Sequence, residues 1–459
     1  MDRGKLKKAE IILERVLKEI KPSDIEIREN TANVNVIMHK LGKIAGKDVE
    51  LRVAGSIARG TNLKGTADVD IFMLFPKGTK KEVLVKKGIA DGRKLCNATH
   101  NRYEIKYAEH AYVRMFIDDL GLKVDLVPAL KIDSIEEMGT TVDRTPMHTE
   151  FILSHLNSRQ KDDVRLLKFL LKAHNIYGAE VKVGGFPGYL CELLIYQFGS
   201  FINLLEAAST FKKPVILDPI SRTALIEEKL VKKFNSQFIV IDPVDRDRNV
   251  AAGASIESLG RFMLIARQFV MGPDISIFKG LAFSSKETHK ALAAFIRRSG
   301  LDFFLLAARV PYKSEDVVWP QLRKLSGMIS EQIARDGFET YAAIPWIDKD
   351  TGLVLIVAPH HRIGARMLKG PSVFLGDAAF RFMESHPDPL GVTISGESLY
   401  VLEKSHHQEI KDVLAGVLKG RLLVKRKDVT FKSAKLWVNA IPAKYSESAY
   451  VELKKRFSI

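Results

Sequence analysis

The spacing of hydrophobic and polar positions divides the first third of the chain into helices and strands. Apolar residues at helical intervals predict helices over 5–21, 23–45 and 79–97. Short apolar runs bounded by turn residues predict strands over 49–54, 69–75, 111–117 and 122–128. These elements together predict a small mixed α/β domain over residues 1–145, with a sheet that is largely antiparallel.

The pattern becomes helical after this domain. Apolar positions recur at helical spacing over 146–157, 160–176 and 188–208, and the glycine-rich stretch GGFPG at 184–188 interrupts them. No strand of comparable length stands out before residue 270. We therefore expect a helical middle domain over residues 146–270.

The remaining residues, 271–459, show a third order of elements. A strand at 303–310, a helix at 314–338, two strands at 340–347 and 353–360, a helix at 373–385 and a strand at 391–402 follow one another. The order βαββαβ is that of a ferredoxin-like sandwich, here over about 301–403. The whole chain is accordingly expected to be an α+β protein of several domains.

Composition adds a charge argument to this outline. The 459 residues contain 71 Lys and Arg against 55 Asp and Glu, which gives a formal net charge of +16. Such an excess favours a polyanionic partner, with nucleic acid the first candidate. The chain has only 2 cysteines, so neither a disulfide framework nor a cysteine-based zinc site is expected. Because no apolar run is long enough to span a bilayer, we expect a cytoplasmic protein without membrane contact.

The residues with the clearest chemistry lie in GSIARGTNLKGTADVD, residues 55–70. Asp68 and Asp70 begin a strand and share one of its faces, where two carboxylates repel each other unless a cation lies between them. Asp125 sits inside another apolar strand. Three carboxylates on neighbouring strands form an oxygen-rich site suited to Mg²⁺. The backbone of Gly55-Ser56, between a strand and a helix start, can cradle phosphate.

This combination resembles the signature of the DNA polymerase β-like nucleotidyltransferases, and more fully the archaeal class I CCA-adding tRNA nucleotidyltransferases. The resemblance rests on Gly55-Ser56, Arg59-Gly60-Thr61, Asp68-x-Asp70 and Asp125, and continues in segments of the middle and C-terminal parts. Those segments are YAEHAYV, DRTPMH, VRLLKFLLKAHNIYGAE, GGFPGYLCELL, IDPVDRDRNVAA and VVWPQLRKL. The resemblance covers nearly the whole chain.

The resemblance implies a function and a role for each matching residue. The enzyme would add or repair the 3′-terminal CCA of tRNA with CTP and ATP, without a template, and Asp68, Asp70 and Asp125 would bind two Mg²⁺ ions. Arg248 would read the base of the incoming nucleotide. The nucleotide-binding set would be Gly55, Ser56, Arg59, His110, Thr145, His148, Lys168, Tyr177 and Arg248. The basic residues Arg421, Lys425, Arg426 and Lys427 would contact the acceptor stem and elbow of tRNA, and the protein could form a homodimer.

Several alternatives stay open at this point. Arg246 competes with Arg248, because both lie in one charged loop. His110, His148, Lys168 and Tyr177 are also compatible with ordinary structural roles. A poly(A) polymerase or oligoadenylate synthetase would share the glycine-serine pair and the three carboxylates. A non-catalytic RNA-binding protein would need only the basic charge and the C-terminal module, but it would gain nothing from clustered acids.

Overall fold

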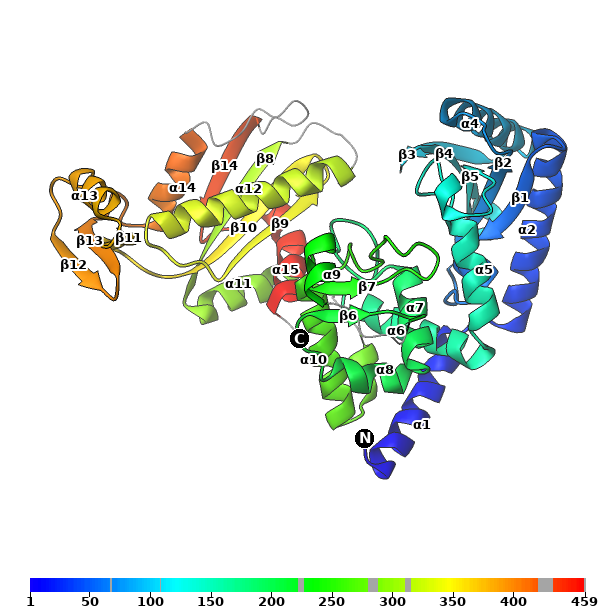
Figure 1. Ribbon diagram of the computed structural model, residues 1–459, viewed down its shortest axis with the longest axis horizontal. Helices are drawn as coiled ribbons and strands as arrows, with labels where there is room; N and C mark the ends of the chain where they lie inside the picture. The colour runs from blue at the N-terminus through cyan, green and yellow to red at the C-terminus, as the bar shows by residue number, and fades with distance from the viewer. Residues whose placement is uncertain are drawn as a thin grey trace. The chain divides into compact units, whose positions relative to one another are not determined.

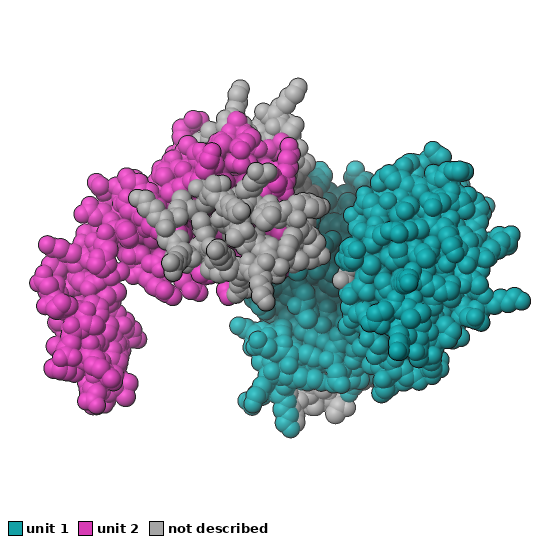
Figure 2. All heavy atoms as spheres, turned by 90° about the horizontal axis from the view of Figure 1, so that it is seen from above, with its two compact units in different colours: residues 1–280 teal, residues 281–459 magenta. Residues whose placement is uncertain are grey.

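The computed structural model describes residues 1–66, 68–107, 109–221, 227–279, 288–309, 315–419 and 432–457. They fall into two compact units, Met1–Gly280 and Leu281–Ile459, which Figure 2 colours separately. Within the described ranges, no helix has both the length and the apolar character needed to cross a membrane.

Unit 1 begins with a five-stranded sheet and its helices (Figure 1). The strand order is β1-β2-β5-β4-β3, and β2 and β5 are the parallel neighbours among otherwise antiparallel pairs. The strands are β1 Glu50–Ala54, β2 Asp68–Phe75, β3 Arg102–Tyr107, β4 Ala111–Ile117 and β5 Leu122–Leu130. The helices are α2 Asp24–Ala45, the short α3 Gly55–Arg59 and α4 Lys81–Ala98. The expected mixed, antiparallel-rich sheet is confirmed.

Alternation along β2 divides its side chains between two faces. Val69, Ile71 and Met73 are buried in one core with residues of α2 and α4. Asp68, Asp70 and Phe72 belong to the other face, where Phe72 packs with Ala129 of β5. Helices α2 and α4 therefore cover one side of the sheet and leave the two aspartates on the opposite side.

The second half of unit 1 is helical, as expected, around a single large core. Its helices are α5 Thr145–His155, α6 Ser158–Ala173, α7 Gly188–Phe198, α8 Phe201–Ala208, α9 Glu227–Phe234 and α10 Ile256–Met271, joined by the N-terminal α1 Arg3–Ile20. The single helix expected at 188–208 is broken at Gly199, whose φ of 80° caps α7 in the left-handed region. A two-stranded parallel sheet, β6 Val215–Leu217 and β7 Phe238–Val240, was not expected. A three-residue strand is too short to show a recognisable alternation of apolar and polar residues in the sequence.

Unit 2 contains a four-stranded antiparallel sheet with the order β14-β8-β10-β9. The elements are β8 Leu301–Arg309, α12 Glu315–Arg335, β9 Ala342–Asp348, β10 Thr351–Pro359, α14 Ile410–Lys419 and β14 Lys432–Val438. Helices α12 and α14 share a core with one face of the sheet, and α15 Ala443–Phe457 packs on the other, where α11 Thr288–Ser299 also lies. The succession βαββαβ is the ferredoxin-like one.

The elements that complete this sandwich differ from those expected. The helix expected at 373–385 forms as α13, but the single strand expected at 391–402 is two antiparallel strands, β12 and β13, and all three elements belong to a separate module with its own three-stranded sheet, β11-β13-β12. The module consists of β11 Ala365–Ser372, α13 Gly376–Glu384, β12 Gly391–Ser395 and β13 Ser398–Lys404 (Figure 1). It is inserted between β10 and α14. Elements α14 and β14 take the places that the sequence assigned to the module.

Candidate active site

The sheet brings two of the three candidate metal ligands side by side. Asp70 of β2 and Asp125 of β5 are direct partners in the parallel register, and Asp68 lies two residues before Asp70 on the same face. Asp68 is exposed, whereas the side chain of Asp125 is only 15% exposed. The three carboxylates therefore lie on one face of the sheet, with Asp68 nearest the solvent.

Gly55 makes this arrangement possible at the start of α3. Its φ is +73°, and a Cβ atom there would lie 2.1 Å from Oδ2 of Asp70. A side chain at position 55 would therefore be strained and would collide with the carboxylate. The glycine of the Gly-Ser pair therefore lets the backbone approach Asp70 closely.

The electrostatics of Asp70 show the cost of bringing the acids together. Burial, followed by the negative charge of Asp125, raises the pKa of Asp70 to about 6 from 3.8. A divalent cation between the two carboxylates would remove that cost. The donor set, carboxylate oxygens without sulfur or imidazole, fits a hard ion such as Mg²⁺.

Asp125 already has a cationic partner from the next strand. Nε and Nη2 of Arg114 on β4 donate to its two carboxylate oxygens at 2.7 and 2.6 Å. Arg114 and Asp125 are register partners, so the sheet itself sets this pairing. In this arrangement the carboxylates do not converge into a ligand cluster. No group of three or more His, Cys, Asp or Glu side chains placed to hold a metal occurs in the part of the chain that the structure describes.

A second cluster joins the sheet domain to the helical domain through Glu192 of α7. The Glu192 carboxylate is fully buried, and Nε of Arg59 lies 3.0 and 2.9 Å from its two oxygens. The Thr61 hydroxyl donates to it at 2.6 Å. Lys168 of α6 lies 3.5 Å from the same carboxylate and donates to the Thr61 hydroxyl at 3.0 Å. Two of the expected nucleotide ligands, Arg59 and Lys168, are therefore brought together, but by a residue that the sequence did not single out.

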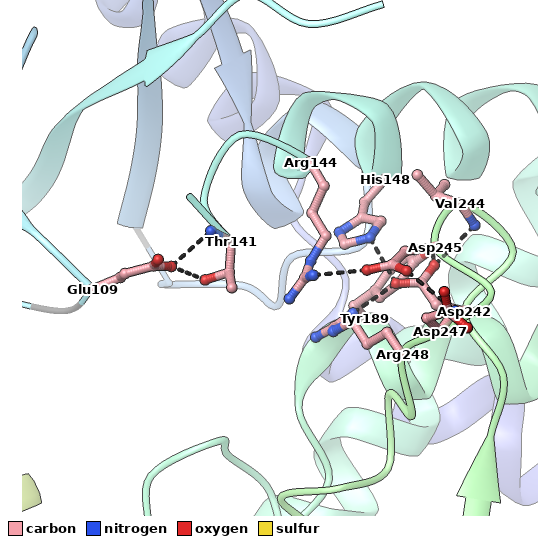
Figure 3. Close-up of polar contacts among 10 residues, drawn as sticks. All are labelled: Glu109, Thr141, Arg144, His148, Tyr189, Asp242, Val244, Asp245, Asp247 and Arg248. Carbon is pink, nitrogen blue, oxygen red and sulfur yellow. Dashed lines mark hydrogen bonds and ion pairs between the residues drawn. The ribbon is translucent and has the colours of Figure 1, made fainter. Parts of the chain in front are cut away.

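A third cluster centres on Asp242, just after β7 (Figure 3). His148 Nε2 and Arg248 Nη1 lie 2.9 and 2.8 Å from its Oδ2 atom, and the Tyr189 hydroxyl donates to Oδ1 at 3.1 Å. The rings of His148 and Tyr189 stack with centroids 4.1 Å apart. Side chains from α5, α7 and the loop after β7 thus meet at one carboxylate.

The charges in this third cluster are well defined. Burial opposes ionisation of Asp242, but the hydrogen bonds from His148 and Arg248 outweigh it and hold its pKa well below the usual range. Burial lowers the pKa of His148. A neutral His148 with its proton on Nε2 donates to the ionised Asp242. One anionic carboxylate therefore orients a neutral imidazole, a phenol and a guanidinium.

The loop after β7 carries both candidate base-reading arginines, and each of them pairs with a different carboxylate. Arg246 makes a bidentate ion pair with Asp218, at the end of β6, with Nη1 donating at 2.7 Å. Arg248 joins the Asp242 cluster and keeps 29% of its side chain exposed. Arg248 is thus the arginine that shares the Asp242 carboxylate with His148 and Tyr189.

The remaining expected nucleotide ligands are distributed around these clusters. Ser56 follows Gly55 in α3, and Thr145 is the first residue of α5. Tyr177 and Lys168 are neighbours, because both side chains lie close to Gly188. A Cβ atom built on Gly188 would lie 3.2 Å from the Tyr177 hydroxyl and 3.6 Å from a side-chain carbon of Lys168. His110 is 8% exposed, and its Nε2 atom is buried without a hydrogen-bond partner.

Three family models match successive parts of this chain. They describe a nucleotidyltransferase domain over residues 36–156, the second domain of tRNA nucleotidyltransferase over 162–279 and the C-terminal domain of the CCA-adding enzyme over 300–422. A CCA-adding enzyme of Methanocaldococcus jannaschii is 35% identical over 425 residues, covering 90% of this chain and 91% of its own. The chain belongs to the CCA-adding enzyme family. The family member of Sulfurisphaera tokodaii is 36% identical and covers 79% of this chain and 82% of its own.

Solved structures of other nucleotide-adding enzymes are more distant from this CCA-adding family member. A cytoplasmic RNA terminal U-transferase matches 60% of the chain with a TM-score of 0.48 and 15% identity. The assignment to the CCA-adding family rests on the sequence relatives and the family models.

The tRNA-binding residues expected of this family member lie elsewhere. Arg421, Lys425, Arg426 and Lys427 fall between α14 and β14, outside the described residues. Their expected contact with tRNA stays a prediction.

Sequence reasoning missed four residues of this CCA-adding family member's site: Arg114, Tyr189, Glu192 and Asp242. Glu192 is the one with a readable signal, because it is a lone acid inside the apolar helix GYLCELLIYQF and such a residue must find a cationic partner when buried. Asp242 lies in IDPVDRDRNVAA, where the resemblance implied a role for Arg248 and none for the aspartate. Arg114 on β4 was visible only as a polar position between apolar ones.

Proposed function

We propose that this chain adds nucleotides to the 3′ end of tRNA, using CTP and ATP to build or repair the terminal CCA without a template. The in-register pair of Asp70 and Asp125, beside the Gly55-Ser56 turn, carries the proposal. Membership of the CCA-adding enzyme family supports it, and the net charge of +16 suits an RNA substrate.

The chemistry would be attack of the tRNA 3′-hydroxyl oxygen on the α-phosphorus of the nucleotide. A new P–O bond forms, the bond to the bridging oxygen of the β-phosphate breaks, and pyrophosphate leaves. Asp68, Asp70 and Asp125 would hold two Mg²⁺ ions, which when bound stabilise the attacking and leaving oxygens. Asp125, once released from Arg114, would lie next to Asp70 and favour removal of the 3′-hydroxyl proton.

The base pocket would be formed by the Asp242 cluster. Arg248 offers hydrogen-bond donors only, which suits the acceptors on the Watson–Crick edges of cytosine and adenine. Asp242 fixes the direction of the guanidinium, and His148 and Tyr189 would supply flat surfaces beside the base. Ser56, Arg59, Thr145, Lys168 and Tyr177 would bind the triphosphate and sugar, and His110 would add a further contact.

The test is incubation of the purified protein with Mg²⁺, labelled CTP or ATP, and tRNA ending at its discriminator base. We expect CTP to be incorporated first and ATP only after two cytidines. Asp125→Asn should abolish incorporation while tRNA affinity in a gel shift stays nearly unchanged. Long ATP-only tails would instead identify a poly(A) polymerase, and no incorporation at all would reject the proposed function.

Two expectations about the whole protein accompany this proposal. A homodimer is tested by light scattering of the purified protein. A cytoplasmic location, expected from the sequence, is tested by fractionating cells that express it.

A further inference from the structure

Glu192 occupies a position that the proposed chemistry does not yet use. It is fully buried, and it is the acid in contact with both Arg59 and Lys168. These two cations come from separate elements, α3 and α6, while Glu192 comes from α7. The carboxylate therefore ties together three helices that carry the phosphate-binding residues.

We propose that Glu192 is a positioning residue that fixes Arg59 and Lys168 for the triphosphate of the incoming nucleotide. This inference rests on the proposed function. Nothing in the resemblance assigned a role to Glu192, and it would not itself touch the nucleotide.

The charge balance of the cluster supports this role. Two cations share the Glu192 carboxylate in a site where Arg59 is 7% and Lys168 is 2% exposed, and the other acid on which the charge of Arg59 acts is Asp70, a proposed metal ligand. A buried excess charge is unfavourable unless a counter-ion reaches it. A polyphosphate supplies that counter-ion. The other contacts of Lys168 are neutral oxygens of Thr61, which orient its ammonium group but do not balance its charge.

Glu192 also determines whether Lys168 carries its charge. Burial lowers the pKa of Lys168, and the nearby Glu192 carboxylate opposes that shift. The other groups that face Lys168 are Cys191 of α7, Tyr177 after α6 and the positive Arg59 of α3. Burial raises the pKa of Cys191 to about 12 and that of Tyr177 further above its usual value, so both stay neutral. Glu192 is therefore the anion that favours the protonated form of Lys168.

The experiment replaces Glu192 by Gln, which keeps the size of the side chain and removes its charge. The probe is inorganic tripolyphosphate, titrated by calorimetry into the full-length protein without RNA, together with kcat and KM for CTP. We expect Glu192→Gln to weaken tripolyphosphate binding and raise KM roughly tenfold or more, the size of one lost charge-assisted contact, with kcat within about threefold. A simple loss of negative charge would instead tighten anion binding.

A pH series separates positioning from a merely structural role. In Glu192→Gln the deficit in affinity relative to wild type should grow as the pH rises, because losing the Glu192 carboxylate lowers the pKa of Lys168 further. Taking the ratio to wild type removes the titration of the phosphate itself. Adding Lys168→Met to Glu192→Gln should weaken binding by less than the sum of the two single effects, because both act through the same ammonium group.

Two further variants complete the test. Asp91→Asn is the matched control, since Asp91 is 3% exposed and pairs with Lys87 at 2.6 Å on α4; it should lower stability without changing tripolyphosphate affinity. If Glu192→Gln does not fold, Thr61→Val takes its place, because the Thr61 hydroxyl bridges Glu192 and Lys168. Thr61→Val should then weaken tripolyphosphate binding severalfold.

The outcomes separate the inference from the proposed function. Equal or tighter tripolyphosphate binding by Glu192→Gln, or by Thr61→Val where that variant takes its place, would overturn the positioning role, as would an equal loss in Asp91→Asn. Wild-type protein that incorporates no CTP would reject the proposed function whatever Glu192 does. Wild-type incorporation combined with unchanged binding in the variant would reject the positioning role alone.

Discussion

Arg114 neutralises Asp125 before any metal ion arrives, because its guanidinium holds both carboxylate oxygens. A metal ion must compete with that bidentate pair. We predict that Arg114→Gln binds Mn²⁺ roughly three- to tenfold more tightly in the absence of nucleotide, since the freed carboxylate adds to the charge beside Asp70. Electron paramagnetic resonance of free Mn²⁺ measures the change.

Arg102→Gln is the matched control for this prediction. Arg102 lies on β3 in the same sheet, its side chain is 55% exposed, and its removal changes the net charge equally. It should leave Mn²⁺ affinity unchanged. If Arg114→Gln also left it unchanged, the ion pair would not compete with the metal.

Asp70 provides a pH test on the same carboxylate pair. Its pKa of about 6 exceeds 3.8, so the folded state favours the protonated form. In EDTA the free energy of unfolding should fall as pH rises between about 4 and 6 and stay low above that range. Asp70→Asn should remove this decline and be more stable than wild type at pH 7 by on the order of 1–2 kcal/mol. Urea unfolding at pH 5 and pH 7 measures it, and a less stable variant at pH 7 would contradict the assignment.

For single residues, the sequence predicted the acidic site residues more successfully than it predicted which residues pair with one another. Asp68, Asp70 and Asp125 could be placed because alternation along a strand fixes the face of each side chain. The shared partner of Arg59 and Lys168 could not, because both contacts to Glu192 depend on helix packing and the one from Arg59 joins residues 133 positions apart. The same holds for Asp242, which meets His148 across 94 positions.

Among the elements, the turn from β1 into α3 has the strictest requirement. Gly46 at the end of α2 and Gly55 both have positive φ, of +89° and +73°, but no atom lies within 4 Å of a Cβ at Gly46. Gly46→Ala should therefore cost about 1–3 kcal/mol from backbone strain alone, because a φ of 89° with a ψ of 172° is a conformation that almost only glycine adopts. Gly55→Ala should cost more and also weaken Mn²⁺ binding, because its Cβ collides with Asp70. Urea unfolding and Mn²⁺ titration measure both; equal costs would mean that the turn relaxes away from the carboxylate.

Element boundaries were predictable where the pattern was long, and pairing was not. The ferredoxin-like order was expected correctly, yet the sequence assigned its second half to α13, β12 and β13 instead of α14 and β14. Local periodicity identifies a strand but not the sheet it joins. Strand β3, RYEIKY, was not predicted, because its charged residues make the short alternation of apolar and polar positions difficult to recognise.

For the whole molecule, the net charge of +16 predicts a strong salt dependence of tRNA binding. If Lys425, Arg426 and Lys427 contact phosphates, their triple replacement by Ala should lower the slope of log K against log salt by roughly 2–3 units. The loss should be smaller on an acceptor minihelix than on full-length tRNA, and kcat at saturating tRNA should hold. Equal slopes for variant and wild type on full-length tRNA would place these residues outside the tRNA contact.

The position of β14 has a consequence for synthesis on the ribosome. Strand β8 pairs with β14 along one edge, and Leu305 of β8 lies opposite Trp437 of β14. Well over a hundred residues are therefore translated between the synthesis of β8 and that of its partner strand. Until then the nascent chain presents an open strand edge made of FFLLAA, a sequence prone to pair with other chains. A premature stop codon before residue 432 would leave that edge permanently open. Such truncated products should aggregate even though every element proposed for catalysis has already been made.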